Sequence, residues 1–113
     1  MTLSEAKRLR AAGCRQGVSQ MVWLIVGTVL CSRFEAEQFG YTPDDTLDAY
    51  NSDELIAAIQ ERWGDNEYHI IYSLTEKMLK ISYIQQFPGC TNAQAPTLLS
   101  ALVDLYCKLA DND

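Results

Sequence analysis

The sequence is short of the residue types that build catalytic and metal sites. Its 113 residues include a single histidine, His69, and its four cysteines contain no CxxC pair. A structural zinc site draws on closely spaced Cys and His ligands, so the sequence predicts no metal. A glycine-rich nucleotide loop is missing, as are the GxSxG and HExxH motifs of hydrolases. We therefore expect no catalytic residues, no cofactor and no metal, and we predict that the protein is not an enzyme.

One enzymatic arrangement stays open as an alternative. A cysteine nucleophile and a histidine base meet in space and need not be neighbours in sequence. Catalysis of this kind would require a concave pocket around His69, with a cysteine or a carboxylate within hydrogen-bond reach.

Basic residues are also few. The chain has 9 Lys and Arg against 15 Asp and Glu, which gives a net charge of −6. A nucleic-acid-binding protein needs a basic face for the phosphates, so we expect no direct nucleic-acid binding. Residues 34–67 contain ten acidic residues and one base, Arg62. The alternative function is therefore an acidic DNA mimic or immunity-type inhibitor that presents residues 44–67 to a basic site.

No segment clearly directs the chain out of the cytoplasm. The longest apolar stretch lies in an uncharged run of 17 residues, 16–32, which is at the short limit for crossing a bilayer. A basic stretch precedes it, as in a signal peptide, but Leu30 before Cys31 does not fit a lipoprotein cleavage site. We expect a cytoplasmic protein without membrane contact, whose cysteines are reduced and mostly buried.

Glycines and prolines divide the chain into segments that we expect to be helices. Thr2 followed by Glu5 is a capping-box pattern that opens the first helix, and Gly13 closes it. Further helices are expected over residues 18–39, from 51 or 52 to 64, from 65 or 66 to 87, and from 96 onward. We predict one all-α domain, 1–113, a bundle of about five helices. Residues 21–26 are rich in β-branched side chains, so a strand there is the alternative.

Two of the expected helices carry more apolar surface than a small bundle can hide. Large apolar residues from Val22 to Val26 would surround the helix at 18–39. Helical residues advance by about 100° each, which gives the helix at 65–87 two apolar stripes. The first stripe is Tyr68, Tyr72, Leu79, Tyr83 and Phe87, and the second is Ile70, Ile71, Leu74, Met78 and Ile81. At least one apolar face should therefore remain for another molecule.

We assign these faces to two kinds of contact. Tyrosine tolerates water at its tip, so Tyr68, Tyr72, Leu79, Tyr83 and Phe87 are the predicted partner-binding residues. We expect a homodimer, with the interface residues Val22, Trp23, Ile25 and Val26. The pattern leaves open which of the two helices forms the dimer.

The overall pattern resembles small helical bacterial antiactivators of LuxR-type quorum-sensing regulators. It consists of the apolar run at 21–30, the acidic stretch at 44–65 and the tyrosine-bearing segment at 68–87. The resemblance implies an oligomer that docks on a transcription regulator and prevents it from binding DNA. The expected function is therefore inhibition of a protein partner through an apolar, aromatic helical face.

Overall fold

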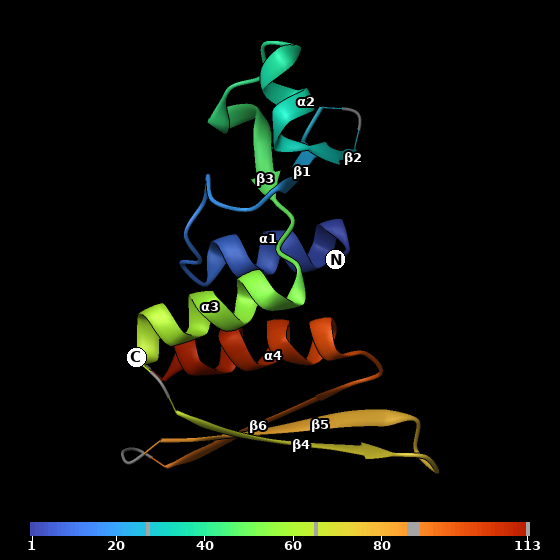
Figure 1. The fold of residues 1–113 in the computed structure, drawn as a ribbon, viewed down its shortest axis with the longest axis vertical. Coiled ribbons are helices and arrows are strands. Elements are labelled where there is room, and N and C mark those ends of the chain that lie inside the picture. The colour runs from blue at the N-terminus through green and yellow to red at the C-terminus, as the bar shows by residue number, and fades with distance from the viewer. Residues whose placement is uncertain (27, 65, 86–88, 113) are drawn as a thin grey trace.

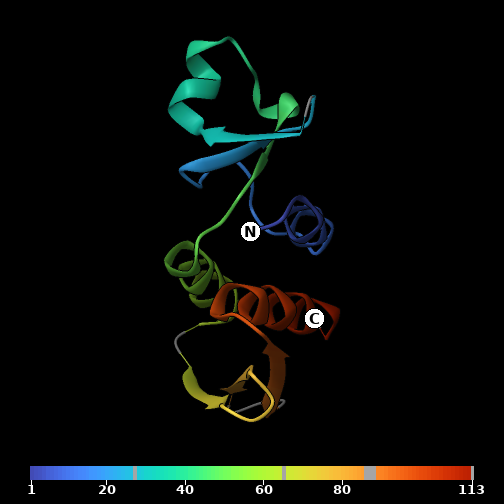
Figure 2. The same cartoon turned by 90° about the vertical axis from the view of Figure 1, so that its right-hand side faces the viewer.

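Two three-stranded antiparallel sheets stand at opposite ends of the molecule, and three helices lie between them (Figures 1 and 2). The computed structural model describes residues 1–26, 28–64, 66–85 and 89–112. The longest extent of the chain, 44 Å, runs from one sheet to the other. The described residues therefore form layers of mixed α and β structure.

The sheet nearer the N-terminus is built from short strands in the order β2-β1-β3. Its central strand, β1 (Met21–Leu24), pairs with β2 (Val29–Ser32) on one side and β3 (Thr46–Asp48) on the other. Two short helices, α2 (Arg33–Gln38) and η1 (Pro43–Asp45), complete this end of the molecule. Strands and helices this short bury few side chains, so much of their apolar surface stays in contact with water.

The helical layer consists of α1 (Leu3–Ala11), α3 (Ser52–Trp63) and α4 (Leu98–Asp111). These helices confirm three of the expected ones, at the start, middle and end of the chain. Helix α4 contributes one apolar stripe to the core: Leu102, Val103, Tyr106 and Leu109 are buried. An amphipathic helix of this kind is stabilised by the surface that its stripe covers.

Side-chain caps explain where two of these helices begin. The Thr2 hydroxyl accepts a hydrogen bond from the Glu5 amide at 3.1 Å, and Glu5 bonds back to the Thr2 amide. Asn51 and Glu54 repeat this capping box at the start of α3. Capping boxes satisfy amide groups that the first helical turn leaves without partners. Local sequence therefore determines both starting points.

The second sheet has the order β4-β5-β6 and packs against the helical layer. It is formed by β4 (Glu67–Ser73), β5 (Met78–Ile84) and β6 (Cys90–Ala95). Helix α4 lies over β5 and β6. The largest buried cluster joins this sheet to the helices and includes Leu9, Leu55, Ile59, Ile81, Tyr83, Leu102, Leu105 and Leu109. The main core therefore lies between α4, α3 and the second sheet.

The predicted all-α helical bundle is wrong, because two of the five expected helices are β-hairpins. The segment expected as a helix at 18–39 forms β1 and β2, and only its last part is helical, as α2. The segment expected as a helix at 65–87 contains β4 and β5. For residues 21–26 the alternative, a strand, agrees with β1. Their β-branched side chains fit a pleated surface better than a helical one.

The second hairpin was missed because a period of two was interpreted as a period of 3.6. In β4 the side chains of Tyr68, Ile70 and Tyr72 point to one face, and those between them to the other. The turn at 74–77 contains no glycine, proline or asparagine, which are the usual signals of a hairpin. Tyr68 and Tyr72 are four positions apart, a spacing that puts both on one face under either period, so the pattern alone did not separate the two.

The turn between β4 and β5 contains a strained residue, and this leads to a prediction about stability. Lys77 has φ of 54°, in the left-handed region that glycine occupies without steric cost. We expect Lys77→Gly to raise the free energy of unfolding by about 0.5–1 kcal/mol, measured by urea denaturation. Thr75→Gly, in the same turn, is the control and should lower it by a similar amount, because Thr75 has no positive φ. A destabilised Lys77→Gly variant would contradict the prediction.

Candidate functional site

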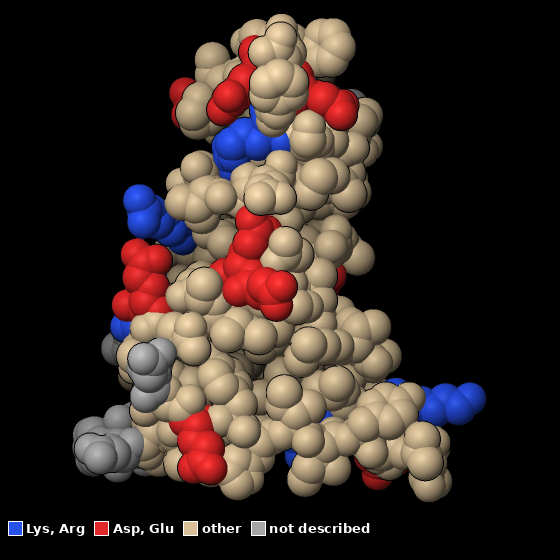
Figure 3. Space-filling view, viewed as in Figure 1, with Lys and Arg blue, Asp and Glu red and all other residues tan. Residues whose placement is uncertain are grey.

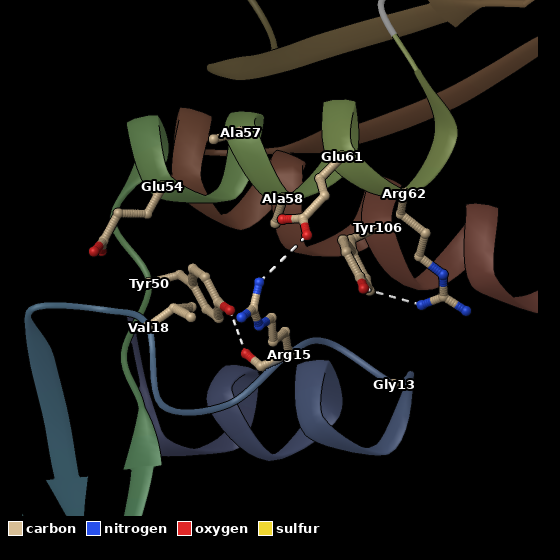
Figure 4. Close-up of a pocket in the computed structure, with 10 residues that line it drawn as sticks. All are labelled: Gly13, Arg15, Val18, Tyr50, Glu54, Ala57, Ala58, Glu61, Arg62 and Tyr106. Carbon is tan, nitrogen blue, oxygen red and sulfur yellow. Dashed lines mark hydrogen bonds and ion pairs between the residues drawn. The ribbon is translucent and has the colours of Figure 1, made fainter.

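A pocket of about 440 Å³ opens between α3 and the segment that follows α1 (Figure 4). Helix α3 supplies one wall, where Ala57 and Ala58 are short enough to leave space. Tyr50 and Tyr106 add their rings, and Val18 lies at the opposite side. The full lining is Gly13, Arg15, Val18, Tyr50, Glu54, Ala57, Ala58, Glu61, Arg62 and Tyr106.

The polar groups around the pocket already have protein partners. Arg15 forms an ion pair with Glu61, with Nη1 and Oε1 3.4 Å apart, and both side chains are largely exposed. The Tyr50 hydroxyl donates a hydrogen bond to the Arg15 carbonyl oxygen. Arg62 donates to the Tyr106 hydroxyl at 3.0 Å. The pocket therefore offers an apolar interior with a rim of paired charges, and a ligand would be bound mainly by burial.

Burial favours the neutral forms of the tyrosine and cysteine side chains beside the pocket. Burial raises the pKa of Tyr50 and that of Tyr106 above the ordinary value for tyrosine. Burial also raises the pKa of the Cys14 thiol, so the thiolate that a cysteine nucleophile requires is disfavoured. These groups suit a structural role better than proton transfer or nucleophilic attack.

His69 lies elsewhere, in β4 of the second sheet. Its Nε2 is 3.0 Å from Glu67 Oε1, and both side chains are more than half exposed. A carboxylate is therefore within reach of the histidine, but the residues lining the described pockets do not include His69. Cys14 follows α1 and is buried in the main core beside Tyr50 and Tyr106. Across the described part of the chain, no group of three His, Cys, Asp or Glu side chains is placed to hold a metal ion.

The strands and helices around β1 expose a large apolar surface. We call the exposed large apolar side chains of residues 18–41 the apolar end: Val18, Met21, Ile25, Val26, Val29, Leu30, Phe34, Phe39 and Tyr41. Phe34 and Phe39 are 70% and 78% exposed. Apolar surface gathered on one segment of a small protein is typical of a protein-binding site. No helix within the described residues combines the length and apolar character that a membrane span needs.

The four predicted dimer residues do not form one exposed surface. Val22 is buried and Trp23 is half-buried. Ile25 and Val26 follow the strand and are 42% and 73% exposed. Only the last two therefore present much surface to a second molecule.

The predicted partner-binding residues lie on one face, but it is the face of a sheet and not of a helix. Tyr68 lies opposite Tyr83 in the β4–β5 register, and Tyr72 lies opposite Leu79. Tyr83 is fully buried in the core, Tyr68 and Leu79 are half-buried, and Tyr72 is 51% exposed. Phe87 falls outside the described residues. Of the four described residues, Tyr72 alone presents a largely exposed side chain.

Sequence reasoning missed Ile70 and Ile71 as exposed residues. The helical interpretation placed both on a second stripe, away from the tyrosines. In the strand, Ile70 shares a face with Tyr68 and Tyr72 and is 52% exposed, while Ile71 on the other face is 65% exposed. Neighbouring residues of a strand point to opposite faces, so the pair Ile70–Ile71 signalled that at least one apolar side chain faces away from the core.

The acidic residues of 44–67 are dispersed and mostly serve local structure. Asp48 is buried against Arg33, and Asp45 caps the η1 turn through Thr42. Glu54 caps α3, and Glu61 pairs with Arg15. In Figure 3 the acidic side chains on the visible face form separate groups along the long axis of the molecule. On this face, the acidic residues that the structure describes therefore do not form a single continuous surface of the kind a DNA mimic would present.

Comparison of this chain with protein-family models, with curated proteins and with solved structures found no match. The resemblance to antiactivators of LuxR-type regulators therefore stays a prediction.

Proposed function

We propose that this chain is a non-enzymatic regulatory protein that binds an apolar segment of a protein partner and inhibits it. The observation that supports this most is that the pocket and the apolar end share the residue Val18. Val18 lines the pocket and is also 46% exposed as a member of the apolar end. One apolar side chain of the partner would enter the pocket beside Ala57 and Ala58, and its neighbours would cover the apolar end.

The charges at the rim favour a ligand that binds by burial. Arg15 and Arg62 are balanced by Glu54 and Glu61, so the pocket attracts neither acidic nor basic ligands strongly. Burial of apolar surface is not screened by salt. Binding through this surface should therefore persist at high ionic strength, whereas a charge mimic would dissociate.

The sequence resemblance indicates the first partner to test. A LuxR-type transcription regulator bound in this way would lose its ability to bind DNA. The proposal requires that addition of this protein releases such a regulator, or another partner, from its functional complex.

A substitution in the pocket wall tests the proposal. Ala57 is exposed on α3, and Ala57→Arg would fill the pocket mouth while keeping a good helix former. We expect the Kd for the partner to rise at least about tenfold, in line with the usual cost of losing an anchor pocket. Affinity capture from the native host with mass spectrometry identifies the partner, and calorimetry at low and high salt measures the Kd.

The matched control is Gln60→Arg, which adds the same charge to an exposed position of α3 outside the pocket lining. It should leave the Kd unchanged. The variant Asp44→Asn combined with Asp53→Asn removes two exposed acids and should alter mainly the association rate. An equal loss of affinity in Ala57→Arg and Gln60→Arg would contradict the proposal. Binding that is abolished by high salt, or by the two asparagine substitutions, would contradict it as well.

A further inference from the structure

The outer edge of β4 has little of the protection that most edge strands carry, since its one acidic residue, Glu67, lies at the start of the strand. It has seven residues, pairs with β5 without interruption, and contains neither proline nor lysine. The opposite edge, β6, is shielded: Lys108 donates a hydrogen bond to the Asn92 carbonyl oxygen at 2.9 Å. Natural proteins blunt exposed edges with charges, prolines or bulges, because free backbone groups pair with other strands. The edge of β4 is therefore available for pairing.

The helical layer also leaves the β4 side of the sheet uncovered. Helix α4 packs over β5 and β6, so Ile81 and Tyr83 are fully buried. Ile70, on the same face of the neighbouring strand, is 52% exposed, and Tyr72 is 51% exposed. Ile71 and Leu74 add apolar surface on and beyond the strand, at 65% and 83% exposure. Whatever pairs with β4 must therefore bring apolar side chains of its own.

Charge favours a second copy of this chain as the occupant. The molecule carries a net charge of −6, which opposes self-association through most of its surface. The β4–β5 hairpin is locally neutral, because Glu67 and Glu76 are balanced by Lys77 and Lys80. Two copies can therefore meet at this hairpin without net repulsion.

The strand is also complementary to itself in one register. A twofold axis perpendicular to the sheet keeps a given residue on the same face in both copies. Two residues that pair across the axis must share a face, so both have even or both have odd numbers. Pairing Ile70 with Ile70 of the second copy engages all seven residues of β4, and a shift by two leaves only five pairs. In this register Tyr68 lies opposite Tyr72 of the second copy. Glu67 faces Ser73 of that copy, so no like charges oppose each other.

We propose that this chain forms a homodimer by antiparallel pairing of β4 with β4 of a second copy, centred on Ile70, to give a continuous six-stranded sheet. Each copy then covers the exposed Ile70 and Tyr72 of the other. The surface is separate from the pocket and the apolar end, so the dimer presents two partner sites.

A charge-swap experiment tests both the dimer and its register. Analytical ultracentrifugation of the wild-type protein should show a species of twice 12.7 kDa at micromolar concentration. Ile70→Lys and Ile70→Glu each place like charges opposite each other across the axis, so each variant alone should raise the dimer dissociation constant by at least about a hundredfold. An equimolar mixture of the two variants should recover a 1:1 dimer, because the introduced charges then attract.

Val26→Lys is the matched control, since Val26 is 73% exposed at the apolar end and far from β4. It should leave the dimer intact, and circular dichroism of every variant should match the wild type. A wild-type monomer, or a dimer lost in Val26→Lys and kept in Ile70→Lys, would overturn the proposal. Monomeric wild type with partner binding abolished by Ile70→Lys would instead assign this edge to the partner. If a mixture of Ile71→Lys and Ile71→Glu recovered the dimer and the mixture of the two Ile70 variants did not, the register centred on Ile70 would be refuted.

Discussion

Replacing Asp48 with asparagine is expected to lower the free energy of unfolding by about 3 kcal/mol. The Asp48 carboxylate is only 2% exposed and accepts hydrogen bonds from the amides of Gly17, Val18 and Ser19 at 2.8–3.0 Å. It also pairs with Arg33, whose Nη2 lies 2.7 Å away. Asparagine removes the negative charge, so the Arg33 cation loses its counter-ion. The NH2 group of asparagine also faces N–H donors where an acceptor is needed.

Urea denaturation at neutral pH measures this loss, and Asp44→Asn is the control. Asp44 is an exposed acid of η1 at the same end of the molecule, and its replacement should change the free energy of unfolding by no more than about 0.5 kcal/mol. An effect of Asp48→Asn as small as that of the control would show that the buried pair contributes little.

The same carboxylate makes stability dependent on pH. Burial alone would raise the pKa of Asp48, but the three amide donors and Arg33 outweigh it and hold the pKa below the ordinary value. The carboxylate of Asp48 therefore contributes its full share of the free energy of unfolding above the unfolded-state pKa of about 4. This share is lost as pH falls through the lower, folded-state pKa. The wild-type protein should lose more stability between pH 5 and about pH 2 than Asp48→Asn does.

The second large effect separates two tyrosines that the sequence pattern treats alike. Tyr83→Ala is expected to lower the free energy of unfolding by about 3–5 kcal/mol, because the ring is fully buried. The Tyr83 hydroxyl also accepts a hydrogen bond from Asn66 at 2.8 Å and donates one to the Gly64 carbonyl at 3.1 Å. Tyr72→Ala removes a half-exposed ring and should cost no more than about 1 kcal/mol in the monomer.

Thermal and urea denaturation of both variants, at concentrations below the dimer dissociation constant, provide the comparison. Loss of partner binding in Tyr83→Ala would then report unfolding, and not a lost contact. Losses of equal size in the two variants would contradict the different burial of the two rings.

Helix boundaries were predictable because caps and stops act within a few residues. The pairs Thr2–Glu5 and Asn51–Glu54 satisfy the free amides of a first turn without help from distant residues. Gly64, with φ of 87°, ends α3 in the conformation that glycine favours. The apolar residues of α4 fit the helical period, which agrees with the helix expected from residue 96 onward.

The pocket lay beyond what the sequence indicates. It brings together Arg15, Tyr50 and Tyr106, which are widely separated in sequence and are joined by the packing of α1, α3 and α4. Nothing in the spacing of these residues signals that their side chains meet. Concave sites of this kind arise from the shape of the assembled layers and have no local pattern.

The sequence by itself determined where α1, α3 and α4 begin, and that apolar surface would remain exposed. Only the tertiary structure decided that 21–32 and 67–84 are hairpins, and hence that Tyr83 is core while Ile70 is at the surface. The physical reason is the range of the interactions. A helix satisfies its hydrogen bonds within four residues, whereas a strand depends on a separate partner strand. The partners of β1 include β3, which follows β2, α2 and η1 in the chain. Which side chains of a strand are buried depends on the helix that packs over its sheet, and α4 reaches β5 and β6 but leaves β4 open.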